Sequence, residues 1–114
     1  MFRTKRQRSV LCSTCPFAKT ANLIGDSVVL LIIRELLKSP HRFGELEEVL
    51  PGVSTRTLTD KLELLVREGV LVRHEFIGKP PKVEYSLTKK GEGLDDVAKA
   101  MVSYGKKYLQ GAAH

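Results

Sequence analysis

One pair of strand-like segments, in a chain whose other apolar patterns are helical, most limits what this sequence can fold into. Residues 70–76 are rich in branched and aromatic side chains, and residues 82–87 alternate apolar with polar ones. The breaker run Gly78-Lys79-Pro80-Pro81 separates the two segments, an arrangement that is typical of a β-hairpin. An isolated hairpin is only marginally stable in water, so this one needs helices to pack against.

The helices expected around the hairpin follow from capping residues and from the spacing of apolar residues. We expect helices at residues 16–24, from Asp26 or Ser27 to about Lys38, at 43–50, at 54–68, and from Thr88 to about Leu109. Pro16 suits a first helical turn, Ser54 suits a helix N-cap, and Gly69 suits the left-handed residue that follows a helix. The run from Val28 to Ile33 is apolar all round, which predicts a helix buried on nearly every side.

The order of these elements predicts the fold class. Two short helices flank the turn at Pro51-Gly52, and the hairpin follows the second of them. This order is typical of a winged helix-turn-helix. We therefore expect a mainly α fold with a small β-hairpin, extended by extra helices at both ends of the domain.

Length and composition favour a small binding domain over an enzyme. The 114 residues match one domain, and 42% apolar with 28% charged residues is an ordinary globular balance. Such a chain is too short for the deep cleft and cofactor scaffold of most metabolic enzymes, so we expect no catalytic residues, no cofactor and no metal. Because the sequence has no apolar signal segment and no membrane-length apolar run, we expect a soluble cytoplasmic protein without a membrane partner.

The net charge of +6 is unevenly distributed. Residues 1–40 hold seven basic and two acidic residues, residues 41–70 hold four and six, and residues 71–114 hold eight and five. We expect a basic N-terminal arm at 1–14, a winged helix-turn-helix domain at 15–110 and a disordered tail at 111–114. The basic excess favours a polyanionic partner, and the alternative for the arm is a solvated, frayed terminus.

The helix at 54–68 has the pattern of a DNA-recognition helix. At about 100° per residue, Leu58, Leu62 and Leu65 point to one side and Arg56 points to the other. An arginine can bind guanine through two hydrogen bonds, and threonine methyl groups suit thymine. The expected contacts with double-stranded DNA are Ser54, Thr55, Arg56, Thr57, Thr59 and Lys61. The alternative is an ordinary amphipathic surface helix.

The hairpin carries the basic side chains that a wing needs. Lys79 and Lys82 flank a stiff Pro80-Pro81 at its tip, and Arg73 lies on its first strand. We expect these three cations to contact DNA backbone or minor groove beside the recognition helix. The alternative is a lysine-rich tip that serves only solubility.

The chain from Cys15 to Gly93 resembles the HxlR-type transcription regulators, relatives of the MarR winged-helix proteins. The resemblance rests on RFGELEEVLPGVSTRTLTDKL, which starts at Arg42, and on PPKVEYSLTKKG, which starts at Pro80. It implies a homodimeric regulator that binds a palindromic operator, and we expect this regulator to act as a repressor. It places helix 54–68 in the major groove and hairpin 70–87 as the wing, and it assigns dimerisation to the first and last helices.

The apolar stripe of the last helix fits this implied dimer interface. The stripe comprises Leu94, Val97, Ala98, Met101, Val102, Gly105 and Tyr108. Gly105 would let two backbones approach closely. The chain departs from the family pattern at Asp26–Val28, where members usually carry Lys-Trp after the glycine, and at Asp60 and Glu63, where they carry arginines.

The two cysteines, Cys12 and Cys15, form a CxxC motif, and Cys15 matches the N-terminal Cys-Pro that several family members use to sense oxidants or electrophiles. Cys15 also occupies a helix N-cap near Lys19, where the helix dipole and basic side chains favour a thiolate. Cys12 could resolve a sulfenate of Cys15 into a disulfide. We therefore expect a thiol switch that responds to a small oxidant or electrophile.

Several alternatives to this switch and to DNA binding stay open. The cysteines could be ordinary reduced thiols, could form a zinc site shared by a dimer, or could form a thioredoxin-like site, although the βαβ context of the last is absent. We expect His41 in a loop and His74 on a strand, without special chemistry. The rival function is a small thiol-redox or metal-binding protein with an incidental basic surface, and a second rival is a winged helix used only for protein contacts.

Overall fold

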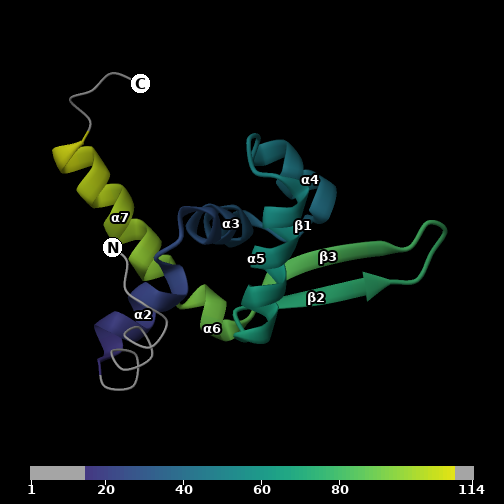
Figure 1. Cartoon of the computed structure of the whole chain (residues 1–114), viewed down its shortest axis with the longest axis horizontal. Coiled ribbons are helices and arrows are strands. Elements are labelled where there is room, and N and C mark those ends of the chain that lie inside the picture. The colour runs from purple at the N-terminus through teal and green to yellow at the C-terminus, as the bar shows by residue number, and fades with distance from the viewer. Residues whose placement is uncertain (1–14, 110–114) are drawn as a thin grey trace.

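The computed structural model describes residues 15–109. Its elements in chain order are α2 (Pro16–Ile24), α3 (Ser27–Lys38), β1 (His41–Arg42), α4 (Phe43–Val49), α5 (Thr55–Arg67), β2 (Leu71–Phe76), β3 (Lys82–Leu87), α6 (Lys89–Glu92) and α7 (Asp95–Tyr108). Figure 1 shows the hairpin β2–β3 projecting from one side of the helices. The predicted winged helix-turn-helix is confirmed. The expected arm at 1–14 and tail at 111–114 lie outside the described residues, and the domain division stays a prediction.

Local signals set the two helices of the helix-turn-helix. The Ser54 hydroxyl oxygen accepts a hydrogen bond from the Thr57 backbone N–H (3.0 Å), which satisfies one of the free amides at the start of α5. Gly52 lies in the turn before α5 with φ of 93°, and Gly69 lies after it with φ of 77°. Both angles are in the left-handed region that glycine adopts without steric cost. The predicted caps and turn are therefore confirmed.

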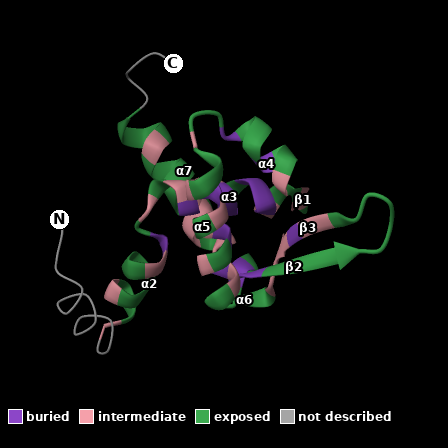
Figure 2. Cartoon of the chain, turned by 45° about the vertical axis from the view of Figure 1, so that its right-hand side comes forward, coloured by how far each residue is buried: buried purple, intermediate pink, exposed green. Residues whose placement is uncertain are grey.

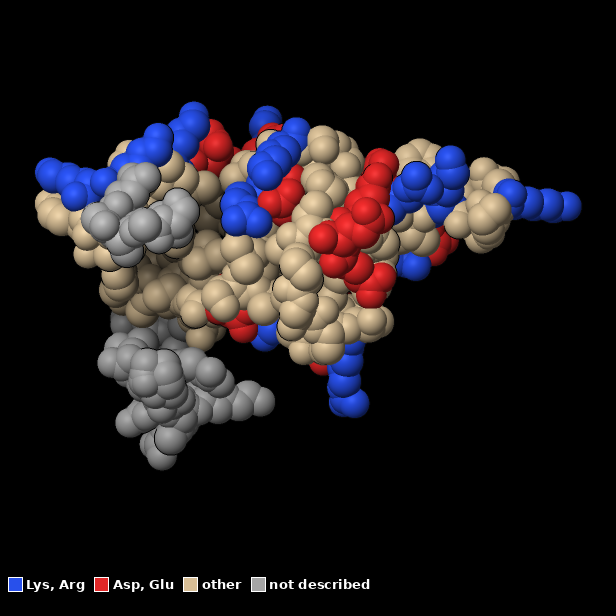
Figure 3. Space-filling view, turned by 90° about the horizontal axis from the view of Figure 1, so that it is seen from above, with Lys and Arg blue, Asp and Glu red and all other residues tan. Residues whose placement is uncertain are grey.

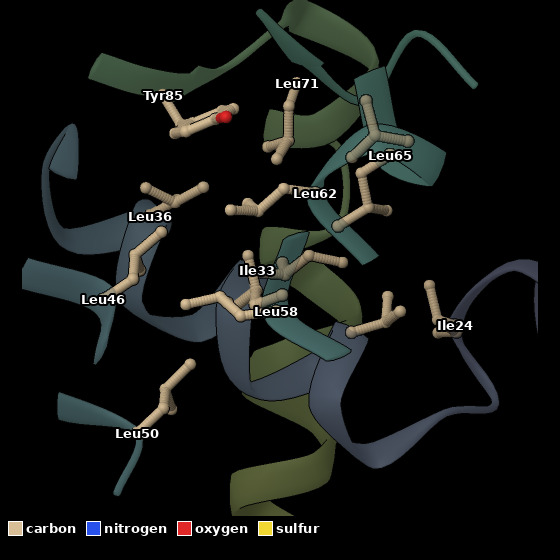
Figure 4. Close-up of a cluster of buried hydrophobic side chains, with 13 residues drawn as sticks. Ile24, Ile33, Leu36, Leu46, Leu50, Leu58, Leu62, Leu65, Leu71 and Tyr85 are labelled. Carbon is tan, nitrogen blue, oxygen red and sulfur yellow. The ribbon is translucent and has the colours of Figure 1, made fainter. Parts of the chain in front are cut away.

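The core lies where α3 and α5 pack against the base of the hairpin. Leu58, Leu62 and Leu65 of α5 are completely buried, as the helical pattern predicts. Figure 4 shows them among side chains from α3, α4 and the strands, including Ile33 and Tyr85. The further buried hydrophobic residues are Ile24, Val29, Ile32, Leu36, Leu46, Leu50, Val70 and Leu71.

Helix α3 is buried on most sides but not on all of them. Val29, Ile32 and Ile33 are buried, whereas Leu30 and Leu31 are only half-buried. The buried acid of this helix, Glu35, forms ion pairs with Arg34 (2.9 Å) and Lys38 (3.2 Å), which compensate the cost of removing its charge from water. The expected all-round burial is thus incomplete on the side of Leu30 and Leu31.

The sheet has three antiparallel strands in the order β1-β3-β2. In the hairpin, Leu71 lies opposite Leu87 and Phe76 lies opposite Lys82. The short strand β1, which the sequence pattern did not predict, places His41 opposite Tyr85. The expectation of His41 in a loop is therefore wrong, because two residues pair with β3 without any periodic signal; His74 lies on a strand as expected.

The C-terminal segment forms two helices, and the expectation of one helix from Thr88 to about Leu109 is wrong. Helix α6 ends at Glu92, and α7 begins at Asp95. At the break, the Leu94 N–H bonds to the Gly91 carbonyl (3.0 Å), three residues back instead of four. Gly91 and Gly93 explain the break, since glycine has a low helix propensity.

Helix α6 is held tightly against the end of α5 and the start of β2. The Thr88 hydroxyl donates to the Gly69 carbonyl (2.5 Å), and the Lys90 ammonium donates to the Glu68 carbonyl (2.7 Å). A Cβ atom on Gly91 would lie 2.4 Å from the Val70 carbonyl oxygen, so only glycine fits there without a shift. We call this contact between α6 and residues 68–70 the α6 junction.

Candidate nucleic-acid interface

The first turns of α5 present an exposed polar surface. Arg56 is exposed and has no ion-pair partner among residues 15–109, so its guanidinium is available to a ligand. The Thr55 hydroxyl donates to the Glu47 carboxylate (2.9 Å) of α4, which ties the two helices together. The Ser54 hydroxyl donates to the Thr57 hydroxyl oxygen (3.0 Å). Because the leucines of α5 are buried on the opposite side, this surface faces away from the core.

The charge around this surface is mixed. Asp60 and Glu63 are exposed further along α5, and Glu45, Glu47 and Glu48 are exposed on α4. Figure 3 shows acidic side chains gathered near the middle of the molecule and basic ones toward the end of the hairpin. The hairpin therefore contributes basic side chains that can attract a polyanion, and Arg56 adds a cation without an ion-pair partner among the described residues at the start of α5.

Lys61 lies on a different side of α5 from Arg56. Its ammonium is 2.8 Å from the Asp26 carboxylate, and its side chain is only 29% exposed. Asp26 also caps α3 by accepting hydrogen bonds from the Val28 and Val29 N–H groups (2.8 and 3.1 Å). The hydrogen bond from Lys61 is the largest effect on Asp26, and together with these amide bonds it lowers the pKa of Asp26 from its ordinary value. The structure thus joins Lys61 to α3, apart from the other expected DNA contacts.

The hairpin holds the second group of expected contacts. Lys79 and Lys82 are exposed at its outer end and form no ion pair within the described part of the chain. Arg73 pairs with the Glu75 carboxylate, which together with the Tyr85 hydroxyl raises the pKa of the guanidinium. The lysines are therefore freer than Arg73 to bind an anion.

The structure adds Arg42 to the basic side chains of the wing. Arg42 lies on β1, opposite Glu84 of β3, and lines a hollow of the hairpin together with Lys79 and Lys82. Sequence reasoning missed this residue because β1 had no pattern of its own. The only available signal was the position of Arg42 directly before the first helix of the helix-turn-helix.

A second exposed surface, which is apolar, lies on α7. No residue of α7 is buried, and Figure 2 shows this helix in the colours of exposed and intermediate residues. Five large apolar or aromatic residues at this end of the chain each expose about half of their area or more: Met101 (48%), Val102 (56%), Tyr104 (59%), Tyr108 (61%) and Leu109 (62%). The first half of α7 borders an apolar groove against α3, lined by Leu30, Leu31, Val97 and others.

The stripe expected for dimerisation is only partly covered within the chain. Leu94, Val97, Ala98 and Gly105 are half-buried, whereas Met101, Val102 and Tyr108 are exposed. Phe17 of α2 is also exposed, at 81%. We refer to the exposed apolar side chains of α2 and α7 as the α2/α7 surface.

Cys15 is a free, half-buried thiol at the N-cap of α2, and its side chain makes no capping hydrogen bond. Cys12 lies outside the described residues, so the structure does not place the two thiols relative to each other. Within residues 15–109, no three His, Cys, Asp or Glu side chains are grouped to hold a metal ion. No helix in this range is both long and apolar enough to cross a membrane.

These features define a DNA-binding winged helix-turn-helix protein. Residues 23–113 match the family model described as HxlR-like helix-turn-helix, and the chain belongs to that family of transcriptional regulators. It is 38% identical over 96 residues to the uncharacterized HTH-type transcriptional regulator sll1512 of Synechocystis. The aligned residues cover 84% of this chain and 71% of the relative.

Solved structures agree with this assignment. A transcriptional regulator of the MarR family from Porphyromonas gingivalis is similar with a TM-score of 0.80 and 28% identity, over 96% of this chain and 99% of that one. The redox regulator HypR in its oxidized form is similar with a TM-score of 0.76 and 30% identity, over 84% of this chain and 99% of that one.

The ion pair between Asp26 and Lys61 gives a test of how α5 is held. Asp26→Asn keeps an oxygen for the α3 amides but weakens the ion pair, so it should cost about 0.5 kcal/mol of unfolding free energy. Asp26→Ala also removes the cap and should cost about 1.5 kcal/mol. Urea unfolding at pH 7 measures both values, and an Asp26→Asn variant as stable as wild type would contradict this role of the ion pair.

The same pair has a defined pH dependence. Because the folded protein lowers the pKa of Asp26, the ionised carboxylate contributes its full stability above the ordinary value of 3.8. That contribution is lost as the pH falls from there through the lower pKa of the folded state. The difference in unfolding free energy between wild type and Asp26→Asn should therefore shrink below pH 3.8.

Proposed function

We propose that this chain acts as a homodimeric repressor that binds a palindromic operator. The first turns of α5 enter the major groove, and the hairpin β2–β3 lies along the adjoining backbone. The observation that carries the proposal is the free guanidinium of Arg56 on the exposed side of a helix whose other side is locked by three buried leucines. Repression then results from occupying DNA that the transcription machinery needs.

The two groups of contacts have different tasks in this proposal. Arg56 donates two hydrogen bonds to a guanine edge, and Thr55, Thr57 and Thr59 contact neighbouring bases or phosphates. Lys79, Lys82 and Arg73 lie against phosphates and contribute affinity without sequence preference. Lys61 acts as a positioning residue, because its pair with Asp26 holds α5 against α3.

The α2/α7 surface supports dimerisation. Met101, Val102 and Tyr108 expose about half of their area or more, and a contiguous exposed apolar surface is typical of an interface. A two-fold dimer through this surface would present two copies of α5 to half-sites about 34 Å apart, one turn of DNA.

Binding to DNA is tested on duplexes that the full chain selects from a random pool. Arg56→Ala should cost about 1–3 kcal/mol and relax specificity at one base pair of each half-site. Lys79→Ala combined with Lys82→Ala should weaken binding to all duplexes and reduce the salt slope of log affinity by about 2 for each subunit. Fluorescence anisotropy across a salt series measures both effects.

Two outcomes of this measurement would favour the rival functions. A chain that binds no duplex, or binds all duplexes without salt dependence, would favour a small thiol or metal-binding protein with an incidental basic surface. Unchanged affinity and specificity in Arg56→Ala would favour a winged helix used only for protein contacts.

The dimer is tested by measuring molecular mass in solution. Wild type should sediment with twice the chain mass, whereas Val102→Glu should dissociate at least about tenfold more readily, because it places a carboxylate in the apolar contact. Val49→Glu on α4 is the matched control, since Val49 is also exposed (41%) but lies outside the α2/α7 surface. A monomeric wild type at micromolar concentration would refute the dimer.

We further propose that Cys15 switches DNA binding in response to an oxidant. The free thiol lies at the N-cap of α2, two residues before the exposed Phe17, so its modification would alter the α2/α7 surface. The similarity to the redox regulator HypR supports such a switch. A change in the dimer angle would alter the spacing of the two copies of α5 and so weaken operator binding.

The chemistry needs a peroxide and a second thiol. The Cys15 thiolate attacks one peroxide oxygen and forms a sulfenic acid, while the other oxygen leaves as an alcohol or water. A thiol of Cys12, or of Cys15 in the partner, then attacks the sulfenic sulfur, and a disulfide forms with release of water. A thiol reductant returns both cysteines to the starting state.

Operator binding before and after mild peroxide treatment tests the switch. Wild type should lose at least about tenfold in affinity and regain it with a reductant, whereas Cys15→Ser should keep its affinity. Cys12→Ser distinguishes the two possible second thiols. In this variant, a disulfide between the two copies of Cys15 would still link the subunits on a non-reducing gel, whereas a disulfide to Cys12 could not form. Equal responses of wild type and Cys15→Ser would end the hypothesis.

A further inference from the structure

The outer end of the hairpin carries an apolar side chain that is fully exposed to solvent. Ile77 directly follows β2 and is 106% exposed, more than any other large hydrophobic residue in the range 15–109. The neighbouring Phe76 is half-exposed, and its ring contacts the His74 ring with centroids 4.6 Å apart. Packing within the chain therefore does not explain an isoleucine at this position.

The surroundings of Ile77 are strongly basic. It borders the hollow of the hairpin that Arg42, Lys79 and Lys82 line, with Glu84 as the one acidic side chain of this lining. Figure 3 shows basic side chains around and beyond this end of the molecule. An apolar group surrounded by free cations suits a polyanion with an apolar-walled groove, which describes duplex DNA better than a protein surface.

Ile77 is separate from the surface proposed for dimerisation. The other strongly exposed apolar side chains, such as Phe17 and Tyr108, belong to α2 and α7. Figure 1 shows these helices on the side of the molecule opposite to the hairpin tip. A second copy bound through the α2/α7 surface would therefore leave Ile77 uncovered.

We propose that Ile77 enters the minor groove of the operator beside each half-site and makes binding sensitive to the base pairs there. This proposal rests on the proposed operator binding by α5. Lys79 and Lys82 contact the phosphates on either side of the groove, and the isoleucine fills the space between the sugar walls. Six residues per strand give the hairpin a length of about 20 Å, which compares with about 17 Å for half a turn of DNA.

The physical basis of the preference is the guanine amino group. The minor groove is about 6 Å wide, and a G·C pair adds the N2 amine to its floor, whereas an A·T pair does not. An isoleucine cannot accept a hydrogen bond, so it would cover this amine and leave it without a partner. Ile77 therefore favours A·T over G·C at positions that α5 does not contact.

The test uses the duplex selected by the full chain, with the outer base pairs of both half-sites changed in turn. Each pair is made A·T, G·C or inosine·cytosine, since inosine lacks the N2 amine but keeps the major-groove acceptors of guanine. Wild type should bind A·T and inosine·cytosine alike and G·C about tenfold more weakly at the position of Ile77. Ile77→Ser should bind all three within about twofold.

Val72→Ser is the matched control, because Val72 is an exposed apolar residue (43%) of β2, the strand that Ile77 follows, and lies near the base of the hairpin. It should keep the wild-type preference. The minor-groove role is refuted if inosine·cytosine binds like G·C, if wild type does not discriminate, or if Ile77→Ser still does. Failure to select any duplex would instead refute the proposed operator binding, and circular dichroism verifies that each variant is folded.

Discussion

The orientation of α5 depends on the burial of its three leucines. Leu58, Leu62 and Leu65 are fully removed from solvent between α3 and the base of the hairpin. Since protein interiors are close-packed, the helix cannot rotate about its axis without opening cavities or creating clashes. The direction of Arg56, which lies on the other side of the same helix, is therefore fixed by apolar packing and not by any contact of its own. Because the buried side of α5 is held rigidly, the few polar side chains on its exposed side can be positioned for specific contacts with bases.

The parts of the fold that depend on neighbouring residues could be predicted from the sequence. Ser54 and Gly69 define the ends of α5 by local hydrogen bonding and by backbone conformation, and the alternation in β3 defines its inner side through Tyr85. The hairpin follows from the breaker run between its strands. In each case the conformational preference of a few adjacent residues determines the local structure, and the tertiary packing is compatible with that preference.

The remaining features depend on residues that are far apart in the sequence. Strand β1 exists because β3 offers free backbone groups to residues 41 and 42. The close approach of Gly91 to Val70, which holds α6 against the start of β2, is encoded by no helical pattern. Lys61 could be assigned to the polar side of α5 from its spacing, but only the fold shows that Asp26 occupies it. Exposure on α7 likewise could not be separated from core packing, because both produce an apolar stripe.

The α6 junction has a consequence for how proteins of this design can diversify. Thr88, Lys90 and Gly91 fasten α6 to the last turn of α5 and the start of β2, so these elements move as one body. The change of direction toward α7 falls outside this body, at Gly93 and Leu94. In the proposed dimer, the distance between half-sites then depends on the backbone at these two residues, neither of which is among the proposed DNA contacts. Substitutions at these two residues could therefore change the operator spacing, whereas substitutions on the exposed side of α5 could change the preferred operator sequence.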